Sequence, residues 1–179
     1  MTVQTAEQNQ DRAHSDERET LLSFLAQQRE FLLTTLRKLD GGQATRRTTA
    51  SELTLAGLVK HLTEVERGWV GFIEEGPKEV DYEDPRTFER HEETFRLVDG
   101  ETLEGVLAEY ARAAEETEAY VRALPDLEVS RKLPDAPWFP EDTSWSARDV
   151  LLHLIRETAQ HCGHADIIRE SLDGQKTMG

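Results

Sequence analysis

Apolar residues recur at the spacing of an α-helix in four separate stretches of the chain, with charged residues between them. In order, these stretches run from Ser15 to Gly41, from Thr54 to Gly76, from Thr102 to Leu124 and from Ser146 onward. Local signals support these limits, because Thr54 suits a helix N-cap and Pro125 cannot continue a helix. Residues 146–149 (SARD) have the spacing of a capping box. The pattern therefore predicts four amphipathic helices.

The segments between the helices are long and irregular in two places. Residues 76–99 form an acidic connection after the second helix, and residues 125–145 form another after the third. Neither contains the alternation of a strand. We therefore expect an all-α fold, a four-helix bundle with long connections after helices two and three. The polar, nonperiodic residues 1–14 are expected to be a disordered tail, and residues 15–179 one bundle domain.

The composition of the chain argues against two classes of binding partner, nucleic acids and membranes. The formal net charge of −15 and the pI near 4.8 argue against binding to nucleic acid or to anionic membrane surfaces. No apolar stretch approaches the length of a membrane span. The chain has a single cysteine, Cys162, and no N-terminal segment resembling a secretion signal, so we expect a cytoplasmic location.

Three polar residues lie on helix faces that should be buried. On a helical wheel, His161 is about 40° from Glu157, and both fall within the apolar stripe of the fourth helix. His61 borders the stripe of the second helix in the same way. A carboxylate directed at a core is costly unless a cation or a hydrogen-bond donor meets it.

A metal ion would meet that need. Side chains four apart on a helix lie on adjacent turns, so Glu157 and His161 can share an ion while His61 supplies a third ligand. Two imidazoles and a carboxylate suit Zn(II), and also Fe(II), Ni(II) or Mn(II). His153 and His164 flank the stripe as rim histidines or as additional ligands. Cys162, about 140° from Glu157, is expected to face elsewhere.

Two runs also resemble a known family. SELTLAGLVKHLTEVERGWVGF resembles the second helix of DinB-like proteins, and WSARDVLLHLIRETAQHCGHADIIRE resembles their fourth, especially in the branch that uses mycothiol, a small-molecule thiol. The resemblance implies a four-helix bundle with metal ligands at His61, Glu157 and His161, and makes a homodimer plausible. Many wider relatives have histidine at the position of Glu157, whereas the mycothiol-dependent maleylpyruvate isomerase branch has glutamate. Many relatives have glutamine at the position of His164.

Three functions fit these features. The resemblance implies a metal-dependent enzyme that adds mycothiol to an electrophilic substrate or uses it to isomerise one. We interpret the chain as a metal-dependent mycothiol S-transferase with a role in detoxification. A metal-dependent hydrolase is the first alternative, since a bound metal lowers the pKa of water to about 7; no residue is clearly the base that hydrolysis needs. A protein that binds a metal or ligand without turnover is the second. The sequence assigns no further catalytic or cofactor-binding residue.

Overall fold

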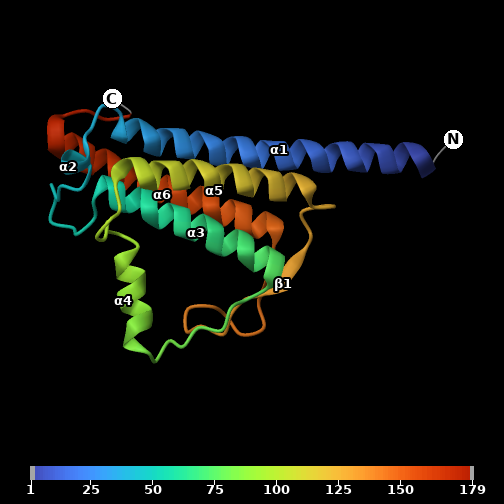
Figure 1. The fold of residues 1–179 in the computed structure, drawn as a ribbon. Coiled ribbons are helices and arrows are strands. Elements are labelled where there is room, and N and C mark those ends of the chain that lie inside the picture. The colour runs from blue at the N-terminus through green and yellow to red at the C-terminus, as the bar shows by residue number, and fades with distance from the viewer. Residues whose placement is uncertain (1–2, 178–179) are drawn as a thin grey trace.

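Four long helices lie side by side and form the body of the molecule (Figure 1). The computed structural model describes the backbone of residues 3–177 and the side chains of residues 17–177. The long helices are α1 (Val3–Leu36), α3 (Leu55–Glu75), α5 (Leu103–Ala123) and α6 (Ala147–Asp173). Within the described residues, no helix is both long and apolar enough to cross a bilayer. The expected all-α four-helix bundle is confirmed.

The first helix begins earlier than the sequence pattern indicates. Its backbone is helical from Val3, where we expected a disordered tail over residues 1–14; residues 1 and 2 of that segment lie outside the described part. Residues 3–14 contain no glycine or proline and include several glutamine, glutamate and alanine residues, which favour a helix. Apolar periodicity does not predict this part of the helix, because residues 3–14 carry no regular apolar stripe in the sequence.

Helices α3 and α6 position the three candidate metal ligands. Thr54 caps α3 by accepting a hydrogen bond from the backbone N–H of Gly57, and Ser146 and Asp149 form the expected capping box at the start of α6. The colours of Figure 1 show that α3 and α6 run antiparallel. Residues late in α3 therefore face residues early in α6.

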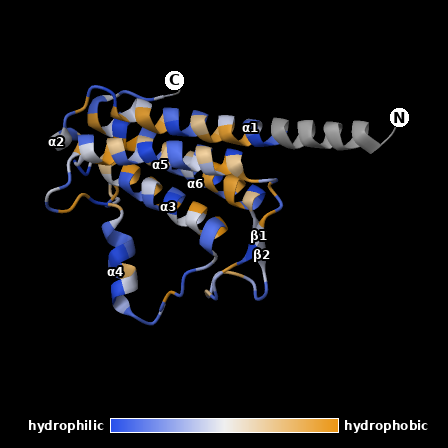
Figure 2. Cartoon of the chain, turned by 45° about the vertical axis from the view of Figure 1, so that its right-hand side comes forward, coloured by the Kyte–Doolittle hydropathy of each residue, from blue (hydrophilic) through white to orange (hydrophobic). Residues whose placement is uncertain are grey.

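The connections contain short elements that the periodicity did not predict. These are α2 (Gly41–Ala44), α4 (Pro85–Glu93), and two antiparallel strands, β1 (Ser130–Lys132) and β2 (Ser144–Ser146). Asp84 caps α4, and Pro85 occupies its first turn. No residue of α4 is buried, and the helix projects away from one side of the bundle with mainly hydrophilic residues (Figures 1 and 2).

The bundle core has two parts along its length. One gathers apolar residues near the end of α1 and the start of α3, and the other gathers those near the end of α3 and the start of α6. A buried arginine of α6 joins the end of α1 to that helix: Arg169 donates to the backbone oxygens of Thr35 (2.7 Å) and Arg37 (3.0 Å). These carbonyls at the end of α1 lack helical partners, so the guanidinium satisfies them.

Candidate metal centre

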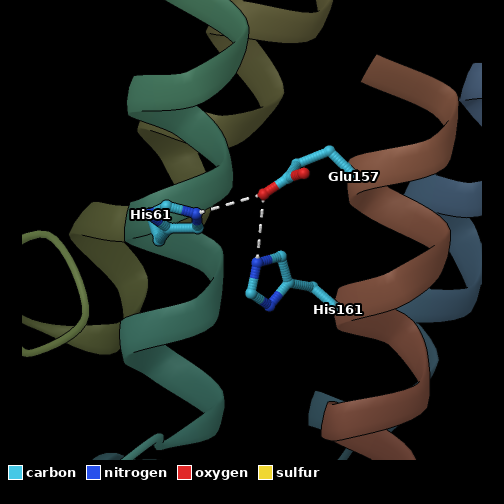
Figure 3. A group of neighbouring side chains, drawn as sticks. All are labelled: His61, Glu157 and His161. Carbon is cyan, nitrogen blue, oxygen red and sulfur yellow. Dashed lines mark ion pairs between the residues drawn. The ribbon is translucent and has the colours of Figure 1, made fainter. Parts of the chain in front are cut away.

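Two helices bring His61, Glu157 and His161 together. Their ligand atoms all lie within 4.8 Å of one another. The Oε1 atom of Glu157 is 3.8 Å from Nε2 of His61 and 3.4 Å from Nε2 of His161. Figure 3 shows the carboxylate reaching from α6 toward both imidazoles, which face each other across the gap between α3 and α6. The three residues predicted from the sequence thus meet at one point; their role as metal ligands stays a prediction.

The distances suit a zinc-sized ion. Two ligand atoms that each lie about 2.0–2.1 Å from a tetrahedral zinc are about 3.3 Å apart. The two separations from Glu157, 3.8 and 3.4 Å, need only small adjustments to reach that value. Three protein ligands also leave a coordination position for an exchangeable molecule, as in catalytic zinc sites.

Hydrogen bonding fixes the tautomer of His61. The hydroxyl of Thr94 donates to the backbone oxygen of His91 at 2.7 Å, so its single proton is committed there. The Nδ1 atom of His61 lies 3.0 Å from that same hydroxyl oxygen and must therefore be the donor. With its proton on Nδ1, the imidazole presents the lone pair of Nε2 toward Glu157 and His161, as a metal-ligating histidine requires.

The remaining nitrogen of His61 is buried without a hydrogen-bond partner among the described residues. Burial, together with the neighbouring His161 and His91, lowers the pKa of His61 to about 3, so the ring is neutral at physiological pH. Burial also lowers the pKa of His161, although Glu157 opposes that shift. Two neutral imidazoles and a carboxylate around an unsatisfied nitrogen fit a divalent cation.

The segment after α4 covers one side of the centre. Phe95 stacks on the ring of His61 with centroids 3.9 Å apart, and His91 meets that ring edge-on at 5.8 Å. The backbone of Phe95 packs so tightly on α3 that a Cβ at Gly57 would lie 1.8 Å from its carbonyl oxygen. These contacts come from a connection without periodicity, so the pattern of apolar residues does not predict them.

The three residues that flank the candidate ligands on α6, His164, His153 and Cys162, make different contacts. His164 is half-buried, and its Nδ1 lies 3.3 Å from Nδ1 of His161, which makes it a neighbour of a candidate ligand. The Nδ1 of His153 instead accepts a hydrogen bond from Arg156 at 2.7 Å. Cys162 faces α1, where its thiol donates to the backbone oxygen of Gln28 at 3.2 Å, and burial raises its pKa to about 11. It is therefore a thiol at neutral pH and points away from the centre, as expected.

Comparison with known proteins agrees with this architecture. A solved structure titled "Crystal structure of the conserved protein of locus from Enterococcus faecalis" is similar with a TM-score of 0.60. It is 14% identical in sequence, and the match covers 88% of this chain and 97% of that chain, so it supports the fold alone. No curated protein sequence matches significantly. The sequence profile of the family described as "Mycothiol-S-transferase" matches residues 20–174. The chain therefore belongs to the mycothiol-S-transferase family.

Proposed function

We propose that this protein is a metal-dependent transferase that joins the sulfur of mycothiol to an electrophilic small molecule. The observation that carries the proposal is the convergence of His61, Glu157 and His161 around the unpartnered Nε2 of His61. Membership of the mycothiol-S-transferase family supports mycothiol as the thiol. Zn(II) is the ion we expect from this ligand set, with Ni, Fe and Mn as the alternatives.

The ligands also suit a thiol substrate electrostatically. Because one carboxylate and two neutral imidazoles neutralise only half the charge of a divalent cation, an ion bound there favours the anionic, nucleophilic form of a thiol at neutral pH. The reaction would form a bond between that sulfur and a carbon of the electrophile. The thiol proton would pass to solvent, and a leaving group would depart with the electrons of its former bond to carbon.

No protein nucleophile is needed in this scheme. The only cysteine, Cys162, contacts α1 and has a raised pKa. Glu157 is engaged with both histidines, so it is poorly placed as the base that hydrolysis would require. Consumption of electrophiles by a protein of this kind would serve detoxification.

The test combines metal analysis with thiol consumption. Elemental analysis of the purified protein should find a divalent transition metal near one equivalent per chain. The metal-loaded protein should then accelerate the reaction of mycothiol with a halogenated bimane or a chlorodinitrobenzene. Cysteine is the control thiol: we expect it to react slowly, because it lacks the remote sugar contacts that help to position the sulfur.

Two variants connect the activity to the centre. Glu157→Gln preserves side-chain size but removes the ligand charge, and should lower both metal content and turnover. Cys162→Ser should keep nearly full turnover because its side chain faces α1. Metal-loaded protein that leaves the mycothiol reaction at its uncatalysed rate, yet hydrolyses an ester or amide in a metal-dependent way, would replace this proposal with the hydrolase.

A further inference from the structure

An aromatic recess lies close to the metal centre, on the same pair of helices. Its volume is about 580 Å³, within the range of small-molecule sites. The walls come from α3, α6, β2 and the connection before β2, and include Trp69, Trp138, Phe139, Trp145, His153 and Arg156. Because α3 and α6 are antiparallel, Trp69 faces His153, with ring centroids 4.8 Å apart, just as His61 faces His161.

The recess and the centre are close enough for one small molecule to reach both. His153 precedes Glu157 by one helical turn, a rise of about 6 Å. Phe95 and Thr94 cover the centre at His61, whose side chain is only 5% exposed. The side chain of Glu157 is 24% exposed and is the most open of the three ligands. The centre is therefore most accessible at Glu157, the ligand nearest in sequence to His153.

The walls suit a flat, unsaturated ring. Trp69 and Trp145 stack at a centroid distance of 4.8 Å and an interplanar angle of 24°. Phe139 meets both of them edge-on, at 6.4 and 5.8 Å. Trp138, on the rim, is 60% exposed and has an aromatic surface available for a ligand. Offset and edge-to-face contacts of this kind favour aromatic ligands over purely aliphatic ones.

The cationic side chain of Arg156, at the rim of the recess, favours ligands that carry a negative charge. The guanidinium of Arg156 is exposed and donates to Nδ1 of His153. No ion pair to a carboxylate is found for it within residues 17–177, although acidic residues outnumber basic ones 36 to 21 in the chain. A guanidinium that retains free donors binds carboxylates and similar anions well.

We propose that this recess binds the electrophilic substrate, and that the preferred substrates are aromatic electrophiles with an anionic substituent. The ring would lie against Trp69, Trp145 and Trp138, and the anionic group would pair with Arg156. This inference rests on the transferase function proposed above, since it assigns the second substrate of that reaction. The reacting carbon would then lie on the side of the ring nearest Glu157.

Binding can be measured without any reaction. Naphthoate is aromatic and anionic but not electrophilic, and its binding to the full chain can be followed by isothermal titration calorimetry, with and without metal. We expect Trp138→Ala and Arg156→Gln each to weaken binding by about 3–10-fold, from loss of a ring contact and of a charged hydrogen bond. The matched controls, Phe24→Ala and Arg46→Gln, change an exposed aromatic residue and an exposed arginine elsewhere and should have no effect.

A neutral probe separates the two contributions. Naphthalenemethanol should lose affinity in Trp138→Ala but not in Arg156→Gln. In steady-state assays, naphthoate should compete with the aromatic electrophile and not with mycothiol. Equal binding of naphthoate by Trp138→Ala and Phe24→Ala would overturn the inference. So would competitive displacement of naphthoate by mycothiol, which would assign the recess to the sugar portions of the thiol.

The experiments distinguish failure of the proposed transferase function from failure of the recess assignment. A protein that binds naphthoate with the expected response to both variants but never consumes mycothiol would contradict the proposed function and leave the aromatic site in place. A protein that turns over mycothiol with an unchanged KM for the electrophile in Trp138→Ala would contradict only the assignment of this recess.

Discussion

The two histidines of the candidate centre are held by different partners. Nδ1 of His61 donates to Thr94, whose own proton is committed to a backbone oxygen, so the orientation of that ring is fixed. Nδ1 of His161 lies 3.3 Å from Nδ1 of His164, and only one of these two nitrogens can donate to the other. Metal binding through Nε2 requires His161 to be the donor. A metal ion bound at Nε2 of His161 therefore selects one tautomer of His161 and one of His164.

Removal of the Thr94 hydroxyl should weaken metal binding. Thr94→Val keeps the shape of the side chain but leaves Nδ1 of His61 without its acceptor. Loss of such an outer hydrogen bond lowers metal affinity by about 10–100-fold. Competition with a chromophoric chelator measures this affinity. Thr87→Val is the control, since it removes a hydroxyl from α4 that donates to the backbone of Asp81; an equal loss of affinity in both variants would count against a specific role for Thr94.

Metal should also stabilise the fold. Without it, the nitrogen of His61 that faces Glu157 is buried and lacks a partner, and an ion that binds only the native state adds stability by mass action. We expect chelation to lower Tm in the wild-type protein, and His161→Ala to remove most of that difference. Calorimetry before and after verified metal removal measures both. An unchanged Tm in the metal-free wild type would contradict the metal site.

At the scale of elements, one close helix–loop contact positions the cover of the centre. Gly57 lies in the first turn of α3, one turn before His61, and the backbone of Phe95 packs directly against it. This contact brings Thr94 to Nδ1 of His61 and Phe95 onto its ring. Because α4 itself buries no residue, the segment depends on the contact with α3 for its position.

A methyl group at Gly57 should therefore disturb the centre. The Cβ of Gly57→Ala would lie 1.8 Å from the carbonyl oxygen of Phe95, so residues 94 and 95 must move. We expect a lower Tm and weaker metal binding. Gly71→Ala, in the same helix, is the matched control, because a Cβ there meets nothing within 4 Å. That control should gain up to about 1 kcal/mol of stability from helix propensity; a Tm that rises equally in both variants would rule out the close contact.

Periodicity predicted the bundle and its three candidate ligands because both depend on helix faces. His61, Glu157 and His161 are polar residues within apolar stripes, and that contrast is visible in the sequence. Thr94 is 33 residues from His61, and their contact depends on the path of a connection with no repeating pattern. Nothing local in the sequence indicates it.

Two of the short elements that apolar periodicity does not predict, α4 and α2, are indicated by helix-capping residues in the sequence. Asp84 followed by Pro85 is a combination that typically begins a helix, so the sequence itself indicates the start of α4. Strands β1 and β2 contain three residues each, too few for alternation to be recognised. The short helix α2 begins at Gly41, where we expected only a helix stop, because Asp40 and Gln43 form a capping box.

At the scale of the whole molecule, a buried charge network joins three of the four long helices. Arg29 of α1 donates to Glu66 of α3 at 2.5 and 3.2 Å and to Glu118 of α5 at 3.2 Å. Arg29 is 5% exposed and Glu66 3% exposed, so neither charge is solvated. Glu118 is more exposed and also pairs with Arg122 at 3.0 Å. Such networks contribute little net stability when intact, but each member depends strongly on the others.

Loss of Arg29 alone should therefore be severe. Arg29→Met leaves the carboxylate of Glu66 buried and unpaired, at a cost of about 3–5 kcal/mol. For a chain of this size, that corresponds to a fall in Tm on the order of 10 °C. The double variant Arg29→Met/Glu66→Leu replaces the pair with apolar side chains and leaves Glu118 with Arg122. It should regain most of the lost stability, and equal Tm values for the single and double variants would show that the unpaired carboxylate is not the cause.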